Sequence, residues 1–497
     1  MYVLVEIALA VAVLWGIRLM GAPETAVRGN RLAALSLLVA ILVVLWPNTV
    51  LTLPIVLASL AVGTVIGLVL AFRVTMLQMP QMVALLNGLG GAASMLTVFV
   101  AAGGGAEGAD PSGRLTGGLA VTVGGVTLSG SLVAAAKLQR LLPQRPIRLW
   151  NNRFMTSALL FLLFLLIFLG ACYAGPGIAL WLLIVAACSL AFGTLFTLPV
   201  GGADMPITIS LLNSTSGVAA SICGFVVDDA FLVAAGAIVG AAGLILTRVM
   251  CAAMNRSLLQ VLAGATVASA SAPASTMASS QGSFPQENSA SPIEREKPVT
   301  FDPVESLLEA QRVIIIPGYG MALGEAETHV RDLYEVLERR GKDVKFAIHP
   351  VAGRMPGHMT VLLADVDIPY DRMVQLETIN SDFARTDVVL IVGACDVVNP
   401  AAITAKGTPI YGMPILHAHE AKRVIICNAD TKPGYSGIEN PLYSRDNVVL
   451  LLGNAASTLE KLLDELILRA SAQDEAIGQI DSIENERANS RQLLNNI

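Results

Sequence analysis

The sequence predicts a polytopic α-helical membrane bundle followed by a soluble α/β, doubly wound (Rossmann-like) domain. Two observations predict this fold class. Of the 70 Asp, Glu, Lys and Arg residues, only 19 lie in residues 1–260, and this part carries a net charge of +5 against −11 for the remainder. Long apolar stretches recur in the first part, whereas short apolar runs alternate with helical periodicity in the second. The 497 residues are therefore divided between lipid and water.

Residues 1–256 are predicted to form a transmembrane domain that crosses the bilayer about nine times. An apolar core of about 30 Å requires roughly 20 helical residues, and only helices satisfy their own backbone groups there. The first stretch carries Glu6 and lacks a basic n-region and a convincing cleavage site, so we expect a helix rather than a signal peptide. The apolar stretches are 2–20, 32–47, 50–72, 82–102, 115–137, 154–174, 178–198, 206–227 and 231–253.

Basic residues in alternate loops predict the orientation of the spans, because loops rich in Lys and Arg stay on the cytoplasmic side. The loops between them carry acidic residues such as Glu107 and Asp110. We therefore expect the N-terminus outside and the soluble domain in the cytoplasm or mitochondrial matrix. The basic residues of these loops are Arg18, Arg28, Arg31, Arg73, Lys137, Arg140, Arg145, Arg148, Arg153, Arg248 and Arg256.

The middle of the spans contains no His, Lys, Arg or Glu, so a proton pathway built on ionisable side chains is not complete in this chain. Asp204 lies at the mouth of the eighth span. Asn87, Asn213 and Ser131 are the polar candidates within spans, either as interhelical hydrogen bonds or as transport elements. Runs of small residues such as Gly88–Ser94 predict close packing of helices.

The six cysteines predict reduced thiols rather than metal ligands or disulfides. They lack metal-ligand spacing, and four lie within or at the end of spans. The other two, Cys395 and Cys427, belong to a domain expected in a reducing compartment. The sequence therefore predicts no metal site.

The soluble part is predicted to have three segments. Residues 257–300 are rich in Ala, Ser, Pro and Gln, a composition that cannot bury a core and is typical of a flexible linker. Residues 301–470 form the nucleotide-binding domain. Residues 471–497 form a charged tail, in which isoleucines at helical spacing indicate either a solvated helix or a contact with a partner subunit.

Short apolar runs after residue 312 predict a parallel sheet. Val313–Ile316 is the first strand, helical periodicity follows at 324–341, and 457–470 is predicted to be the closing helix. Because strands alternate with helices, we expect ligands at the carboxyl ends of the strands. The further apolar runs predicted as strands are 343–348, 361–363, 388–392, 424–427 and 448–452.

Two loops of this domain predict dinucleotide binding in an unusual pose. Gly318-x-Gly320 follows the first strand and opens a helix, as in a dinucleotide fingerprint, but the third glycine position is Leu323. The second strand ends at His349 instead of the acid that ordinarily holds a ribose hydroxyl. The following loop, Pro350–His358, combines glycine and proline with Arg354, which predicts phosphate binding. His349 and His358 are either structural residues of this loop or catalytic bases.

Several long motifs resemble those of the beta subunit of proton-translocating nicotinamide nucleotide transhydrogenases. The resemblance covers about residues 1–470. The motifs are Met79–Asn87, Gly201–Pro206, Leu212–Ser214, Pro317–Ala322, His349–His358, Gly393–Ala402 and Gly434–Gly437.

The resemblance implies an enzyme subunit that transfers hydride between NAD(H) on an alpha subunit and NADP(H) on this chain, coupled to proton movement across the inner (cytoplasmic) membrane. It implies an alpha subunit with the NAD(H)-binding domain and further transmembrane helices, and a homodimer of the alpha–beta unit. No nucleic acid is implied. Because both nucleotides carry the reactive carbons, the protein is expected to orient and gate rather than to supply acid–base chemistry.

The resemblance also assigns residues. Asp396 is implied as the catalytic residue that senses protonation or nucleotide state, and Gly434 and Tyr435 as part of a mobile lid. The implied proton path is Asn87, Ser131, Asp204 and Asn213. The implied nucleotide-binding residues are Gly318, Tyr319, Gly320, Met321, Val351, Ala352, Gly353, Arg354, Met355, Pro356, Gly357, Gly393, Ala394, Cys395, Asp396, Asn428, Ala429, Gly434, Tyr435, Asn454 and Ala455.

Three departures from the family pattern bear on the coenzyme. Asn428–Asp430 stands where the family has Lys-Arg-Ser to grip the adenosine 2′-phosphate, Ala456 replaces a lysine, and Cys395 replaces an asparagine. Each lost charge-assisted hydrogen bond is worth about 1.5–3 kcal/mol. The sequence thus predicts weakened NADP(H) binding, with NAD(H) as the alternative ligand. It also keeps open a nucleotide-sensing transporter or channel, or a non-catalytic paralogue.

Overall fold

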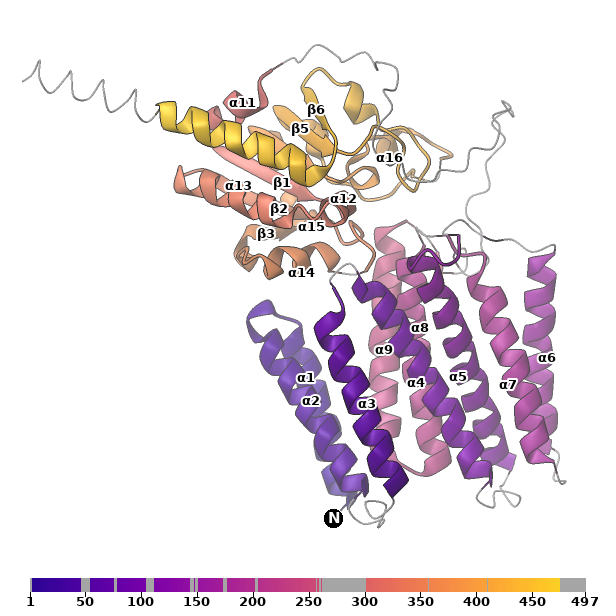
Figure 1. Ribbon diagram of the computed structural model, residues 1–497. Coiled ribbons are helices and arrows are strands. Elements are labelled where there is room, and N and C mark those ends of the chain that lie inside the picture. The colour runs from indigo at the N-terminus through magenta and orange to yellow at the C-terminus, as the bar shows by residue number, and fades with distance from the viewer. Residues whose placement is uncertain are drawn as a thin grey trace, which may run out of the picture. The chain divides into compact units, whose positions relative to one another are not determined.

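The computed structural model divides into two compact units at residue 266, each described by itself (Figure 1). It describes residues 2–45, 54–75, 78–103, 111–143, 147, 151–172, 177–201, 204–255, 257–258, 261, 301–355, 357–408 and 410–473. Most of the predicted linker and the tail from residue 474 lie outside these residues, as do Glu107, Asp110, Arg145, Arg148 and Arg256 of the topology prediction.

Long helices make up the described part of the first unit, and each overlaps a predicted span. The predicted start of the second span at residue 32 is wrong, because α2 begins at Pro23 and contains Arg28 and Arg31, which were expected beside a loop. Eight of them, α2 to α9, are long and apolar enough to cross a membrane, which confirms a polytopic helical bundle. The helix before them, α1, has 19 residues of similar character. The bounds are α1 Tyr2–Met20, α2 Pro23–Leu45, α3 Pro54–Arg73, α4 Met79–Gly103, α5 Pro111–Leu138, α6 Asn152–Cys172, α7 Ile178–Thr197, α8 Met205–Val227 and α9 Ala230–Ala253.

Small residues let these helices approach at backbone distance, as predicted. A Cβ atom placed on Gly91 of α4 would lie 2.6 Å from the carbonyl oxygen of Gly124 on α5. Since a side chain at either position would force the two helices apart, glycine is required at this crossing. Helix α5 packs against α4, α6, α7 and α8, and therefore lies at the centre of this part of the bundle.

A buried cation lies at each end of α5 and contacts the C-terminal end of a neighbouring helix. Arg114 donates from Nη2 to the carbonyl oxygen of Ala171 in the last turn of α6, at 3.0 Å. Lys137 donates from Nζ to the carbonyl oxygens of Leu198, the C-cap of α7, and Val200, the latter at 2.7 Å. Positive charge at a helix C-terminus satisfies carbonyl groups that have no partner within their own helix.

The second unit is built on one parallel sheet of six strands in the order β3-β2-β1-β4-β5-β6. The order reverses direction between β1 and β4, which confirms a doubly wound, Rossmann-like domain. All residues of β4 and most of β1, β2 and β5 are buried, as expected for strands covered on both faces. The strands are β1 Arg312–Pro317, β2 Asp343–Ile348, β3 Met373–Gln375, β4 Val388–Val392, β5 Arg423–Asn428 and β6 Val448–Leu452.

Helices connect the strands, and the predicted closing helix is present at 455–473 (yellow in Figure 1). The helices bounded individually are α11 Pro303–Glu309, α12 Tyr319–Leu323, α13 Glu327–Arg339, α14 His358–Asp365, α15 Leu376–Ile379 and α16 Ala401–Thr404. The short 3-10 helices are η4 Tyr370–Arg372, η5 Phe383–Arg385, η6 Asp396–Val398, η7 Ala418–Glu420 and η8 Pro441–Ser444.

The prediction of a strand at 361–363 is wrong, because these residues lie within α14. Met359, Leu362 and Leu363 are buried, a spacing that places all three on one face of a helix. The third strand is instead β3, which has only three residues at the edge of the sheet and lacks a long apolar run.

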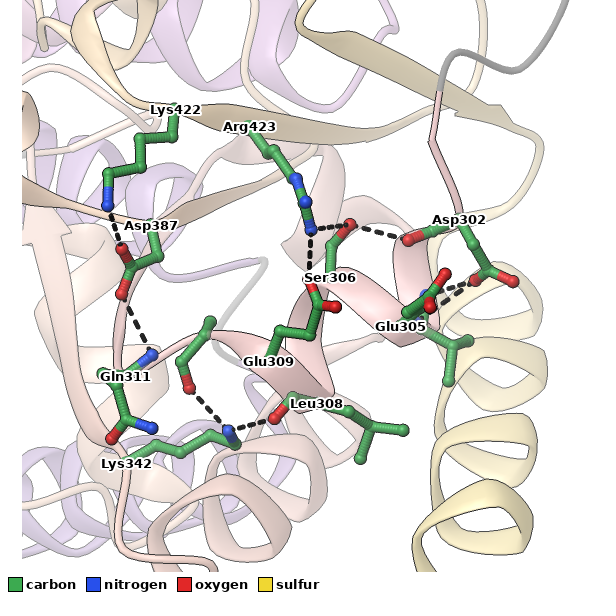
Figure 2. Close-up of polar contacts among 12 residues, drawn as sticks. Asp302, Glu305, Ser306, Leu308, Glu309, Gln311, Lys342, Asp387, Lys422 and Arg423 are labelled. Atoms are coloured by element: carbon green, nitrogen blue, oxygen red, sulfur yellow. Dashed lines mark hydrogen bonds and ion pairs between the residues drawn. The ribbon is translucent and has the colours of Figure 1, made fainter. Parts of the chain in front are cut away.

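A polar network closes the amino edge of the sheet, opposite the predicted ligand edge (Figure 2). The carboxylate of Asp387, directly before β4, accepts hydrogen bonds from the backbone N–H groups of Gln311 and Arg312 at 3.0 Å each. It also accepts one from Lys422 at 2.8 Å. The hydrogen bond from Lys422 and those two N–H groups lower the pKa of Asp387 to about 2. The starts of β1, β4 and β5 are thereby tied together.

Neighbouring polar contacts hold the first helix of this unit, α11, in place (Figure 2). Lys342 donates to the carbonyl oxygens of Leu308 and Ala310, at 2.6 and 2.5 Å, and so satisfies the C-terminal end of α11. At the other end of α11, Asp302 accepts from the N–H of Val304 as the N-cap and pairs with Arg469 of the closing helix.

Candidate functional site

The predicted nucleotide-binding residues lie on the segments that follow the carboxyl ends of five strands, so the topology gathers them at one edge of the sheet. Pro356 lies outside the described residues. The others are Gly318–Met321 after β1; Val351–Met355 and Gly357 after β2; Gly393–Asp396 after β4; Asn428 at the end of β5, then Ala429, Gly434 and Tyr435; and Asn454 and Ala455 after β6.

Three glycines bring the loops after β1 and β4 into backbone contact. A Cβ atom on Gly318 would lie 2.3 Å from the carbonyl oxygen of Gly393, and one on Gly320 would lie 2.6 Å from Gly393 Cα. Gly393 itself has φ +69°, a left-handed conformation that favours glycine. The N–H groups of Gly318 and Gly320 donate to the carbonyl oxygens of Val392 and Gly393, both at 2.8 Å. These two N–H groups therefore hold the loops together, and other donors are needed for a pyrophosphate.

The loop after β2 is shaped by two histidines. His349 Nδ1 accepts from the N–H of Val351 at 3.2 Å, and His349 Nε2 lies 2.9 Å from the carbonyl oxygen of Pro414. His358 Nδ1 accepts from the N–H of Arg354 at 3.2 Å. Burial lowers the pKa of His349 to about 4, and burial with the nearby Arg354 charge lowers that of His358 to about 4. Both rings are thus neutral at pH 7 and hold backbone groups, which favours structural roles over those of catalytic bases.

Arg354 joins this loop to the loop after β1. Its guanidinium carbon lies 4.5 Å from the ring centroid of Tyr319, and that ring lies 6.3 Å from the ring of His358. Among the residues that the structure describes, no carboxylate forms an ion pair with Arg354. A planar guanidinium fixed by an aromatic ring and unopposed by an acid suits a phosphate.

Asp396 contacts the segment that contains the predicted lid residues Gly434 and Tyr435. The carboxylate of Asp396, at the start of η6, accepts from Ser436 Oγ at 2.7 Å and from Ser436 N at 2.9 Å. A Cβ atom on Gly434 would lie 2.6 Å from Asp396 Oδ2, so only glycine allows this approach. Tyr435 between them is exposed. The segment 434–436 therefore covers the carboxylate that the family resemblance singled out.

The end of β5 carries Asn428, Ala429 and Asp430, none of which is a cation. Asn428 is buried, and its Nδ2 donates to the carbonyl oxygen of Ala394 and to Tyr443 Oη, each at 3.0 Å. Ala429 and Asp430 are exposed, and Asp430 pairs with Lys432 at 3.3 Å. Asn428 thus holds the β4 loop, while the exposed positions offer a methyl group and a carboxylate.

Asn454 has a structural contact as well. Its Oδ1 accepts from the N–H of Ala456 at 2.9 Å, so it caps the closing helix. Ala455 is buried against the position of Gly324. Ala456 contributes no cation at this helix start.

Sequence reasoning missed two residues that support the β4 loop. Asn440 donates from Nδ2 to the carbonyl oxygen of Cys395 at 3.1 Å, next to the Asn428–Tyr443 contact. Burial raises the pKa of Tyr443 and of the Cys395 thiol. The signal in the sequence was the Asn440–Pro441 pair, which marks a helix start: the N–H of Leu442 donates to Asn440 Oδ1.

In the membrane unit, three of the four predicted proton-path residues are buried: Asn87 on α4, Ser131 on α5 and Asp204 at the N-cap of α8. Asn213 on α8 is half-buried. A Cβ atom on Gly88, next to Asn87, would lie 3.1 Å from Ser131 Cβ. Helices α4, α5 and α8 contact one another, so these residues lie on mutually packed helices.

The similarity to known proteins extends over both units. The sequence model of the family described as NAD(P) transhydrogenase beta subunit matches residues 2–465. The chain belongs to this family. Two curated relatives, both named NAD(P) transhydrogenase subunit beta and both from Rhodospirillum rubrum, are each 38% identical over 452 residues, which is 89% of this chain and 94% of the relative.

As an NAD(P) transhydrogenase beta subunit, the chain is a subunit of an oxidoreductase and a membrane protein, and the expectations of fold and family are confirmed. Membership of this family implies NADP(H) binding and an alpha subunit as partner. The comparisons do not support the alternative of a nucleotide-sensing transporter or a non-catalytic paralogue.

Proposed function

We propose that this chain transfers hydride between NAD(H), bound on its alpha subunit, and a dinucleotide held at the carboxyl edge of its own sheet, and that this transfer is coupled to proton movement through the membrane unit. The observation that supports the proposal most is that a single beta-subunit family match extends over both the helical bundle and the doubly wound domain. Neither unit alone requires such a reaction.

The residues at the carboxyl edge fit the pyrophosphate half of a dinucleotide. The loop after β2 supplies Arg354, which lies over the ring of Tyr319, and the loops after β1 and β4 are in backbone contact through their glycines. The dinucleotide supplies the hydride chemistry when it is bound. The protein orients it and excludes water, and neither buried histidine supplies a proton.

Asp396 is proposed to report the state of the bound nucleotide through segment 434–436. Its carboxylate takes both of its described hydrogen bonds from Ser436. Movement of that segment therefore exposes the charge of Asp396, and closure covers it. This pairing supports the proposal that Gly434 and Tyr435 belong to a mobile lid.

The exposed residues after β5 do not fit a 2′-phosphate. Asp430 carries a negative charge, Ala429 offers no hydrogen-bond donor, and Lys432 lies against Asp430. We propose that NADP(H) binds more weakly here than in a site with two cations, by roughly a hundredfold if two charge-assisted hydrogen bonds are lost, and that NAD(H) competes for the site.

The proposed proton path comprises Asn87, Ser131, Asp204 and Asn213, with the ionisable group supplied by helices of the alpha subunit. Support comes from the burial of three of these residues on packed helices. We also propose that the alpha–beta unit forms a dimer in the inner membrane, with the N-terminus outside and the nucleotide domain in the cytoplasm.

The function is tested by reconstituting this chain with its alpha subunit in proteoliposomes. We expect hydride transfer between NADH and an NADP analogue to accelerate or slow when a pH gradient is imposed. A transfer rate indifferent to the gradient would overturn the coupling.

Titration of residues 300–497 with each nucleotide tests the coenzyme preference. Tight NADP(H) binding without detectable NAD(H) binding would overturn the weakened preference.

A further inference from the structure

The hydroxyl of Thr197 is an exception among the described helical threonines of the bundle. Most of these, such as Thr127 and Thr194, donate to the carbonyl oxygen four residues earlier in their own helix. Thr197, the last residue of α7, is fully buried, yet its Oγ1 has no hydrogen-bond partner among the residues that the structure describes. A buried hydroxyl without a partner is destabilising, so its presence requires a reason.

Two proposed path residues share this condition. Ser131 Oγ and Asn87 Nδ2 are also buried and lack partners within the described chain. A Cβ atom on Gly130, adjacent to Ser131, would lie 3.0 Å from Thr197 Oγ1, and Ser131 itself lies against Gly88, adjacent to Asn87. Thr197 Oγ1 therefore lies beside the α5 position next to Ser131, and Ser131 lies beside the α4 position next to Asn87. Buried polar groups without partners in one region are the usual setting of internal water.

Lys137 fixes Thr197 in this arrangement. Lys137 is 1% exposed, and its ammonium donates to the carbonyl oxygens of Leu198 and Val200, one and three residues after Thr197. Lys137 lies six residues after Ser131 on α5, less than two helical turns away. The helix that carries Ser131 therefore also holds the end of the helix that carries Thr197. The same segment leads on to Asp204, the N-cap of α8.

We propose that Thr197 is a further residue of the proton path, a water-binding hydroxyl between Ser131 and the end of the bundle where Asp204 begins α8. Lys137 is the positioning residue that keeps Thr197 in register with Ser131. The inference rests on the proposed function. It adds a hydroxyl and a cation that the sequence did not single out for the path.

The test compares Thr197→Val with Thr247→Val in the reconstituted complex with the alpha subunit. Thr247 is also fully buried, but its hydroxyl has two partners, Ser210 Oγ and the Gly243 carbonyl oxygen. We expect Thr197→Val to slow proton-coupled hydride transfer about tenfold, the effect of one hydrogen bond on a rate, and to leave the melting temperature unchanged or higher. Thr247→Val should lower the melting temperature and keep the wild-type number of protons per hydride. Thr197→Ser, which keeps the hydroxyl, should restore the rate.

The outcomes separate the two proposals. If the wild-type complex ignores a pH gradient, the proposed function itself fails. If the wild type responds and Thr197→Val transfers protons at the wild-type rate, only this inference fails. A Thr197→Val complex that melts earlier or does not assemble would make the hydroxyl structural, and would likewise overturn the inference.

Lys137 is tested against the equivalent cation at the other end of α5. Lys137→Met should slow proton-coupled transfer and shift its dependence on pH, whereas Lys137→Arg should retain both, because a guanidinium can still donate to the two carbonyl oxygens. Arg114→Met removes the matching contact with α6 and should lower the melting temperature only. Equal effects of Lys137→Met and Arg114→Met on the pH profile would contradict a positioning role for Lys137.

Discussion

Exchanging Ala429 for Arg and Asp430 for Ser should move the coenzyme preference of this chain toward NADP(H). Both positions are exposed and follow directly after β5, so the double substitution should change the stability of the fold by less than about 0.5 kcal/mol. It removes a carboxylate that repels a 2′-phosphate and adds a guanidinium that can bind one in two-point fashion. It also releases Lys432 from its ion pair with Asp430.

The expected size follows from the contacts that change. A hydrogen bond between charged groups contributes about 1.5–3 kcal/mol, which corresponds to roughly a tenfold to hundredfold gain in NADP(H) affinity. NAD(H) affinity should stay within about twofold, because NAD(H) has no 2′-phosphate to bind the new cation. The surface position of the pair favours the lower end of this range, since water and salt screen exposed charges.

The assay is a nucleotide titration of residues 300–497 at two salt concentrations, with binding followed by calorimetry. Asp430→Asn serves as the matched control, because it removes the charge without adding a donor and should give only a small part of the gain. The reasoning is refuted if the double variant leaves NADP(H) affinity unchanged, or raises NADH and NADPH affinity equally. Either result would place the 2′-hydroxyl away from the end of β5.

Three further perturbations test other parts of the domain. Gly434→Ala places a methyl group about 2.6–2.8 Å from the Asp396 carboxyl atoms and should weaken nucleotide binding severalfold more than Ser436→Ala does, as measured by the same titration. Asp387→Asn should lower the free energy of unfolding by roughly 2 kcal/mol at pH 7, because the pKa of Asp387 is about 2 in the folded chain against 3.8 ordinarily. This stabilisation is present above pH 4 and is lost as the pH falls toward 2. The urea midpoints of the two proteins should therefore converge near pH 2. Burial holds His349 neutral, so the domain should lose stability as the pH falls from about 6.5 to about 4. In His349→Gln the urea midpoint should depend less on pH over this range.

The membrane helices could be predicted closely because one constraint governs them. A span must be apolar over about 20 residues, so the stretch 206–227 already located α8, with Asp204 at its mouth. The nucleotide domain offered a weaker signal. Long buried strands such as β4 were evident, but β3 has three residues at an edge, and a helical apolar face at 359–363 was mistaken for it.

The sequence predicted which residues lie at the candidate site, but not which groups they hydrogen-bond to. Glycine spacing located the loop after β1, and the family resemblance located the loop after β4, yet neither indicated that the N–H groups of Gly318 and Gly320 donate to the carbonyl oxygens of Val392 and Gly393. The inward turn of Asn428 depends on Tyr443, fifteen residues away, which only the folded chain brings within reach. Contacts of this kind follow from tertiary packing and leave no local pattern.

The two cations of α5 limit how the bundle can rearrange. Arg114 anchors the start of this helix to the end of α6, and Lys137 anchors its finish to the end of α7. An axial slide of α5 in either direction would pull at least one of these buried cations away from its carbonyl acceptors, which is costly for a charge held inside the bundle. We therefore expect α5 to keep its axial position. Any alternation of access between the two sides of the membrane would then require the helices around α5 to tilt or rotate.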